Sequence, residues 1–221
     1  MPNPIPLEPG KFYHIYNRGN NGENIFIAER NFAYFLNLYL KHIEPVAETY
    51  AYCLLRNHFH TFVRVRPERP GRFSADHQPL LAASKAGQID SPDSGAKTCQ
   101  VYSPSQAFSN LFNAYTKSIN KAYGRTGSLF EKPFRRIEVA TPEYALQLVH
   151  YIHRNPQKHG FVHDFREWPY SSYHALLSDR PTHLQRDQVL AWFSGRVEFD
   201  AVHQMMIDEK SILDLIGDDE D

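Results

Sequence analysis

The stretch YCLLRNHFHTFVRV at residues 52–65 decides the fold, because it holds two largely apolar segments separated by a short polar break. The first segment belongs to a predicted strand at 46–55, and the second to a predicted strand at 59–66. Little more than Arg56 and Asn57 remains to connect them. A connection this short favours an antiparallel hairpin.

Two histidines, His58 and His60, flank Phe59 at the start of the second segment. Two residues of strand return a side chain to the same face, about 6.6 Å further along. Both imidazoles are therefore expected on one face, where they form a candidate clamp for a metal ion. His-x-His spacing alone is weak evidence, so two ordinary histidines on the polar side of a half-buried strand remain the alternative.

A second motif follows about ninety residues later, in ALQLVHYIHRNPQKHG at 145–160. Its apolar residues fit one face of a short helix that Pro156 and Gly160 would end: Leu146, Val149 and Ile152. Tyr151 and Asn155 lie one turn apart on another face. If that face meets the histidine pair, the phenol is placed as a metal-assisted nucleophile toward a phosphate. A core tyrosine with a helix-capping asparagine is the alternative.

The remaining elements complete an α+β pattern. The expected order adds a strand at 11–17, helices at 29–43 and 105–123, a strand at 134–140, and a start for the Tyr151 helix at Thr141-Pro142-Glu143. This β-α-β-β-α-β order predicts a ferredoxin-like (RRM-like) sandwich, with an antiparallel sheet that carries the histidine pair and helices on one face.

The expected organisation is one main domain at 1–178 and a small helical appendage at 179–221 that ends in an acidic tail. Short helices are expected at 187–193 and 199–207. Residues 67–103 are polar and rich in Pro, Gly and Ser, which predicts a mobile insertion with at most a short helix at 79–86.

Composition excludes several classes of protein. A chain of 221 residues with 42% hydrophobic residues can bury one substantial core. Its two cysteines, Cys53 and Cys99, suggest neither a disulfide framework nor a zinc knuckle. The sequence has no apolar leader and no run of eighteen apolar residues, so we expect a cytoplasmic protein without a membrane partner.

The net charge of −1 averages two unlike segments. The stretch between residues 107 and 136 contains six cationic residues and a single acidic one, Glu131. The cationic residues are Lys117, Lys121, Arg125, Lys132, Arg135 and Arg136. Aromatic residues interleave them at Tyr123, Phe130 and Phe134, and an aromatic ring that stacks on an exposed base contributes about 1–3 kcal/mol. Together with Asn17 and Arg18 in the turn NRGNNG, these cations are candidates for DNA binding. A solvated face, core aromatic residues and a plain turn are the alternatives.

The motifs RNHFH, GSLFEKPFRR and YIHRNPQKHG stand in the order found in REP-associated tyrosine transposases, and the chain resembles this family over about 11–177. These belong to the single-tyrosine transposases of the HUH class. The resemblance implies that His58 and His60 bind Mg²⁺ or Mn²⁺, that Asn155 is a third ligand, and that Tyr151 is the nucleophile. It also implies a 5′-phosphotyrosine intermediate with a free 3′-OH on single-stranded DNA with a hairpin, and a homodimer whose active site can combine the histidine pair of one subunit with Tyr151 of the other.

Three alternatives to this assignment differ in the residues that they require. Tyr115 is rejected as nucleophile because it shares the apolar stripe of its helix: Phe108, Leu111, Phe112, Tyr115 and Ile119. A binding module that holds structured nucleic acid without cutting it would not need the four polar groups of the candidate site. A zinc hydrolase would need a further ligand, for which His14 is the candidate.

Overall fold

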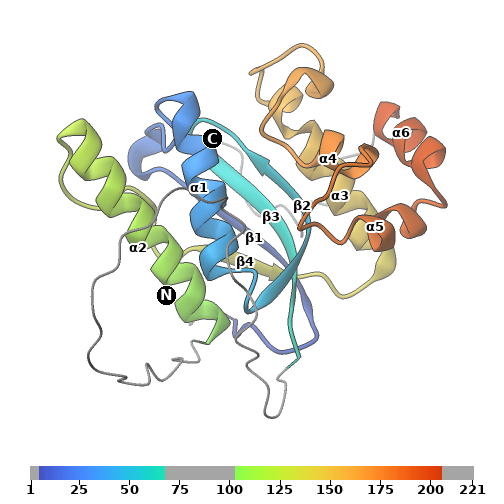
Figure 1. The fold of residues 1–221 in the computed structure, drawn as a ribbon, viewed down its shortest axis with the longest axis horizontal. Helices are drawn as coiled ribbons and strands as arrows, with labels where there is room; N and C mark the ends of the chain where they lie inside the picture. The colour runs from blue at the N-terminus through green and yellow to red at the C-terminus, as the bar shows by residue number, and fades with distance from the viewer. Residues whose placement is uncertain (1–4, 68–102, 206–221) are drawn as a thin grey trace, which may run out of the picture.

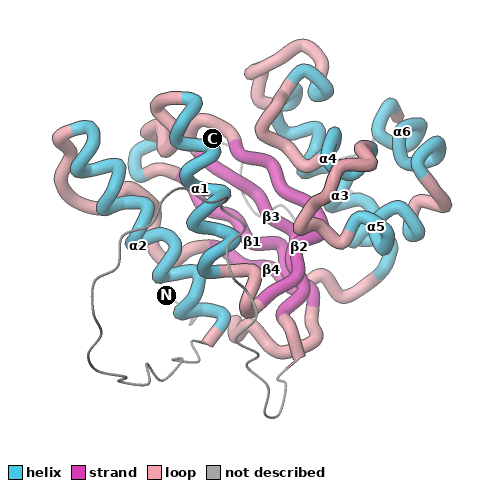
Figure 2. Tube along the Cα trace, in the orientation of Figure 1, coloured by secondary structure: helices cyan, strands magenta, loops and turns pink. Residues whose placement is uncertain are grey.

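Four strands form one antiparallel sheet in the computed structural model, which describes residues 5–67 and 103–205 (Figures 1 and 2). They are β1 Phe12–Arg18, β2 Ala47–Leu54, β3 His58–Val65 and β4 Arg135–Glu138, in the order β2-β3-β1-β4. Strands β2 and β3 are the predicted hairpin, with Leu54 opposite Phe59. The α+β sandwich with an antiparallel sheet is confirmed.

Helices α1 Glu29–His42 and α2 Pro104–Tyr123 cover one face of this sheet (Figure 1). Phe35 of α1 and Phe112 of α2 pack on Phe59 of β3, with ring centroids 5.3 and 5.7 Å apart. Tyr115 is fully buried in this layer and donates its hydroxyl hydrogen to the Ile25 carbonyl at 2.8 Å. It belongs to the core, as its position on the apolar stripe predicts.

The opposite face of the sheet is covered as well, which the sequence did not predict. Helix α3 Pro142–Lys158 packs on β2 and β3. Helix α5 Arg186–Trp192 adds Trp192, which stacks on Tyr50 with centroids 5.1 Å apart and contacts Phe62 at 6.1 Å. Because side chains alternate along a strand, the face that carries Phe62 also carries His60.

Short elements complete the described chain: η1 Asn20–Gly22, η2 Phe165–Glu167, α4 Tyr173–Leu177 and α6 Arg196–Gln204. Before α4, the Trp168 indole donates to the Leu54 carbonyl at 2.9 Å, and Tyr170 and Ser172 make backbone hydrogen bonds with β2. This segment covers the outer edge of β2, where unpaired backbone groups would otherwise face solvent.

Helix α3 begins where predicted, since the Thr141 hydroxyl accepts a hydrogen bond from the Tyr144 amide at 3.2 Å. Its end differs from the prediction, because the helix continues through Pro156 to Lys158. A proline this close to the end removes one hydrogen bond without breaking the preceding turns. Gly160 then takes a φ of +69°, which suits a residue without a β-carbon.

Two predicted segments lie outside the described residues. They are the insertion between β3 and α2, with its short helix at 79–86, and the acidic tail beyond residue 205. Among the helices of the described residues, none is both long and apolar enough to cross a bilayer.

A buried pair of histidines joins α6 to α3. The His203 Nδ1–H donates to the Phe199 carbonyl at 2.7 Å, so its Nε2 accepts from His153 Nδ1–H at 2.8 Å. His153 Nε2 in turn contacts the Ser172 hydroxyl at 2.7 Å. Burial lowers the pKa of both rings, so both are neutral at pH 7.

Acidification is expected to destabilise the fold through His203. Burial lowers the pKa of His203 to about 3, opposed by the hydrogen bond to Phe199 and by Asp200, and assisted by His150 and Arg154. Below pH 6.5 the His203 side chain is therefore protonated in the unfolded chain but stays neutral in the folded chain. The free energy of unfolding should fall by up to about 1.4 kcal/mol per pH unit from this group between pH 6.5 and 3.

Urea unfolding at pH 7 and pH 5 measures this loss. His203→Gln can still accept from His153 but does not titrate, so it should lose about 1–2 kcal/mol less than the wild type between the two pH values. Equal losses in the two proteins would assign the acid sensitivity to other groups.

Candidate active site

The His58 and His60 side chains share one face of β3, as strand alternation predicts, and this face points toward α3. Their ring centroids are 5.1 Å apart with the planes nearly perpendicular. His60 is 1% exposed, whereas His58 is only partly buried. The pair therefore has one ring deep in the protein and one near its surface.

Helix α3 brings Tyr151 and Asn155 to the same place. The Tyr151 ring centroid lies 5.6 Å from that of His60, at an interplanar angle of 83°. The Asn155 Nδ2 donates to the Tyr151 carbonyl at 3.2 Å, which fixes the amide and leaves its oxygen without a hydrogen bond in the described part of the chain. Asn155 also lies close enough to His58 to affect its pKa. The two motifs, ninety residues apart in sequence, thus meet within one chain.

His14 of β1 lies directly behind His60. Its Nε2 is 2.9 Å from His60 Nδ1, and the two rings stack with centroids 5.1 Å apart. The hydrogen bond occupies Nδ1 of His60 and leaves Nε2 as the nitrogen able to bind a ligand. That Nε2 is buried and has no hydrogen-bond partner among the described residues. His14 therefore orients His60, which argues against its use as the extra ligand of a zinc hydrolase.

Burial sets the protonation state of both histidines. It lowers the pKa of His58 to about 3, helped by His159 and Arg18 and opposed by the Asn155 amide. Burial and the neighbouring His14 hold the pKa of His60 well below its usual value. Both rings are neutral at pH 7, which is the form that binds metals.

The donor set fits a divalent cation. It offers two imidazole nitrogens and an amide oxygen, and the buried His60 Nε2 and Asn155 oxygen both lack hydrogen bonds within the described residues. No group of three or more His, Cys, Asp or Glu in residues 5–67 and 103–205 is arranged to hold a metal. Mg²⁺ prefers oxygen ligands, so two imidazoles favour Mn²⁺ among the two expected ions.

Removal of the His14 ring should weaken this site. His14→Phe keeps the volume but frees His60 to rotate, and loss of such an orienting partner typically lowers metal affinity by about 10–100-fold. Titration calorimetry with Mn²⁺ measures the change. His14→Gln, which can still hydrogen-bond Nδ1 of His60, should recover part of the affinity, and exposed His163→Phe should change nothing. Unaltered Mn²⁺ binding in His14→Phe would remove His14 from the site.

Two exposed side chains that were not predicted as site residues, those of Lys158 and His159, lie at the rim. The Lys158 Nζ is 5.3 Å from the Tyr151 ring centroid, and the His159 ring centroid is 4.8 Å from that of His58. Lys158 follows Tyr151 by seven residues, two turns along the same helix face, so this spacing could have indicated it. The His159 contact depends on how α3 crosses the sheet.

The DNA-binding candidates separate into two groups. Four of them line one groove of about 760 Å³ between α2 and the segment 127–136: Asn17, Lys117, Lys132 and Arg136. Lys121, Arg125 and Arg135 do not line it, and Arg125 pairs with Glu23. Arg18 lies opposite His58 in the β1–β3 register, with its Nε 3.5 Å from Glu131 Oε1.

The aromatic residues proposed for base stacking are mostly structural. Phe130 and Phe134 are buried in the core, so the stacking interpretation is wrong for them. The Tyr123 hydroxyl donates to the Asn31 side-chain oxygen at 3.1 Å. Asn17 is also buried, and its amide donates to the Glu131 carbonyl at 3.3 Å.

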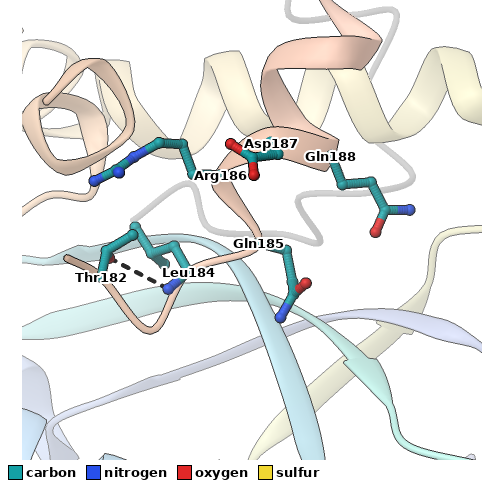
Figure 3. A pocket seen from close by; sticks show the side chains of 6 residues that line it. All are labelled: Thr182, Leu184, Gln185, Arg186, Asp187 and Gln188. Carbon is teal, nitrogen blue, oxygen red and sulfur yellow. Dashed lines mark hydrogen bonds between the residues drawn. The ribbon is translucent and has the colours of Figure 1, made fainter. Parts of the chain in front are cut away.

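A smaller hollow of about 210 Å³ lies at the start of α5 (Figure 3). It is lined by one continuous segment and contains none of the candidate site residues: Thr182, Leu184, Gln185, Arg186, Asp187 and Gln188. The Thr182 hydroxyl accepts from the Leu184 amide at 3.3 Å. The hollow is a surface feature of the C-terminal helices.

The antiparallel sheet of this α+β fold carries the histidine pair on the face that packs against α3 and its Tyr151. The fold is similar to a solved structure described as the REP-associated tyrosine transposase bound to a REP hairpin, with a TM-score of 0.52 and 18% sequence identity. The match covers 82% of this chain and 88% of that chain. No protein-family model and no curated protein matches the sequence. The structural match confirms the fold that the resemblance implied.

Proposed function

We propose that this chain is a metal-dependent REP-associated tyrosine transposase, which nicks and rejoins single-stranded DNA at hairpin-associated sites through a covalent 5′-phosphotyrosine. One observation carries the proposal. Tyr151 lies 5.6 Å from His60, ring centroid to ring centroid, in a cluster of side chains that also contains His58 and Asn155. A similar fold has been solved with a REP hairpin, which supports hairpin DNA as the substrate.

The proposed reaction is a transesterification. The Tyr151 phenol loses its proton, and its oxygen attacks the scissile phosphorus and forms a Tyr–O–P bond to the 5′ end. The P–O3′ bond breaks, and the released 3′ oxygen takes up a proton to become a free 3′-OH. Attack of a 3′-OH on the phosphotyrosine reverses the step and joins strands, so no energy source is consumed.

His58, His60 and Asn155 would hold the divalent cation, Mn²⁺ or Mg²⁺. When bound there, the ion polarises the phosphate and offsets charge that develops on its oxygens. Lys158 lies over the Tyr151 ring and can place a second positive charge beside the same phosphate. Arg18, at the end of β1 opposite His58, can contact the neighbouring phosphate.

Access to Tyr151 requires side chains at the rim to move, because the tyrosine is only 4% exposed. Lys158 and His159 are both exposed; Lys158 lies over the Tyr151 ring, and the His159 ring makes an edge contact with that of His58. Movement of these two side chains toward a bound phosphate would open this side of the site. Burial of Tyr151 until DNA binds would also keep water and other electrophiles away from its phenol oxygen.

The proposal also covers the localisation, the oligomeric state and the domain limits of the protein. We expect a cytoplasmic homodimer with a catalytic domain at 1–178 and a C-terminal appendage at 179–221. A single chain already brings Tyr151 to the histidine pair, so each subunit can hold a complete site.

A non-cutting module that binds structured single strands is the second candidate. The buried position of Tyr151 is the observation in its favour, because a binding protein has no need to expose the phenol. The two candidates differ in one product, the covalent protein–DNA adduct.

The decisive experiment incubates the protein with end-labelled single-stranded oligonucleotides that carry short hairpins, with Mn²⁺ and with EDTA. A labelled protein band that survives denaturation, and appears only with Mn²⁺, is the expected result. Binding to the hairpins without an adduct, over a broad set of flanking sequences, would favour the non-cutting module.

A further inference from the structure

The groove between α2 and the segment 127–136 lies beside the candidate active site. Asn17 is part of its lining, and the next residue, Arg18, lies opposite His58 in the register of β1 and β3. Glu131 also lines the groove and is ion-paired with Arg18. The groove lies on the α2 side of the sheet and the histidines lie on the α3 side, and the Arg18–Glu131 pair at the end of β1 connects the two.

Positive charge dominates the groove. Lys117 and Lys132 project from opposite walls, and neither forms an ion pair or hydrogen bond among the described residues. Glu131 is the acidic residue in the lining, and Arg18 offsets its charge. Two exposed ammonium groups without acidic partners favour an anionic ligand.

Arg136 supplies a third cation in an unusual setting. Its guanidinium lies 3.9 Å from the Phe134 ring centroid and donates to the Ser105 hydroxyl at 2.8 Å. Its Nε is buried and has no hydrogen-bond partner within the described residues. A flat guanidinium held against an aromatic ring presents its other face as a surface on which a base can stack.

The α2 wall of the groove is polar. Asn113, Thr116 and Lys117 lie three and four residues apart, on one face of the helix. The Asn113 and Thr116 side chains make no hydrogen bond to other described residues, so their donors and acceptors are available to a ligand. Phe112 and Phe130 form an apolar floor beneath them.

We infer that this groove binds the single-stranded DNA that flanks the hairpin and guides it to Tyr151. Lys117 and Lys132 contact phosphates, Asn113 and Thr116 contact base edges, and Arg136 stacks with a base. A duplex presents its phosphates but not its base faces, so the stacked guanidinium of Arg136 favours a single strand. The inference rests on the proposed function, because it assigns the path of the same substrate.

Fluorescence anisotropy of a fluorescein-labelled oligo-dT strand in EDTA tests the groove without requiring cleavage. Lys117→Gln combined with Lys132→Gln should weaken binding roughly ten-fold at low salt. It should also reduce the slope of log affinity against log salt by about 1.4, at about 0.7 for each lost phosphate contact. The matched control is Lys41→Gln, an exposed lysine of α1 outside the groove, which should behave as wild type.

An affinity and slope equal to wild type in the double variant would overturn the inference. So would a duplex of the same length that competes as well as the single strand. Photocrosslinking with 4-thiothymidine gives an independent readout, since the labelled peptides should come from 104–123 and 127–136.

Parallel adduct assays separate this inference from the proposed function. A wild-type adduct together with oligo-dT binding unaffected by the lysine changes would leave the function standing and place the DNA elsewhere. Lysine-dependent binding without any adduct would retain the groove and reject the nicking reaction.

Discussion

Tyr151→Phe is expected to abolish the covalent protein–DNA adduct and strand cleavage, while hairpin DNA still binds with wild-type affinity. The substitution removes one oxygen and leaves the ring that packs against His60 and beneath Lys158. Because no other group replaces a lost nucleophile, cleavage should fall by at least about 10⁴-fold. Denaturing gels of end-labelled hairpin oligonucleotides measure the adduct, and anisotropy measures binding.

Tyr115→Phe provides the matched control. It removes the hydroxyl of another buried tyrosine, which donates to the Ile25 carbonyl on the far face of the sheet. This variant should lose about 1–3 kcal/mol of stability and keep the adduct. An adduct that persists in Tyr151→Phe and disappears in Tyr115→Phe would reverse the assignment of the nucleophile.

The second large effect concerns the histidine pair. His58→Ala combined with His60→Ala should remove metal-dependent cleavage, since it leaves Asn155 as the sole member of the donor set. Loss of an orienting partner lowers metal affinity by about 10–100-fold. Loss of the two histidine ligands themselves should lower the Mn²⁺ affinity further. Calorimetry with Mn²⁺ and the adduct assay measure the two consequences separately.

The partly buried His58 keeps this test informative if the double variant folds poorly. His58→Ala alone disturbs little packing, and exposed His163→Ala controls for the loss of a histidine. Thermal unfolding of each variant shows whether it is folded. Undiminished cleavage by a folded His58→Ala variant in EDTA would reject the role of the metal.

Secondary structure followed closely from local pattern. The hairpin of β2 and β3, the cap at Thr141 and the limits of α1 and α2 agree with the prediction to within one or two residues. Strand alternation also placed His58 and His60 on one face, and helical spacing placed Tyr151 and Asn155 one turn apart. These features depend on residues close together in the chain, so the sequence carries them directly.

The position of Phe130 and Phe134 shows where local pattern fails. Aromatic residues among cations are compatible with a stacking surface and with a core, and both rings are buried beneath the groove. The choice between these outcomes depends on how the chain folds back after α2, because Phe112 and Phe108 of that helix pack on Phe130 and Phe134.

By itself, the sequence determined the α+β order of elements, the shared face of the two histidines, the shared face of Tyr151 and Asn155, and the burial of Tyr115. Only the tertiary structure decided that α3 lies across the face of β3 that carries His60, that His14 orients His60, and that Lys158 lies over Tyr151. The physical reason is the range of the interactions. Backbone geometry repeats over two to four residues, whereas the packing of α3 against the sheet depends on contacts between residues about ninety positions apart.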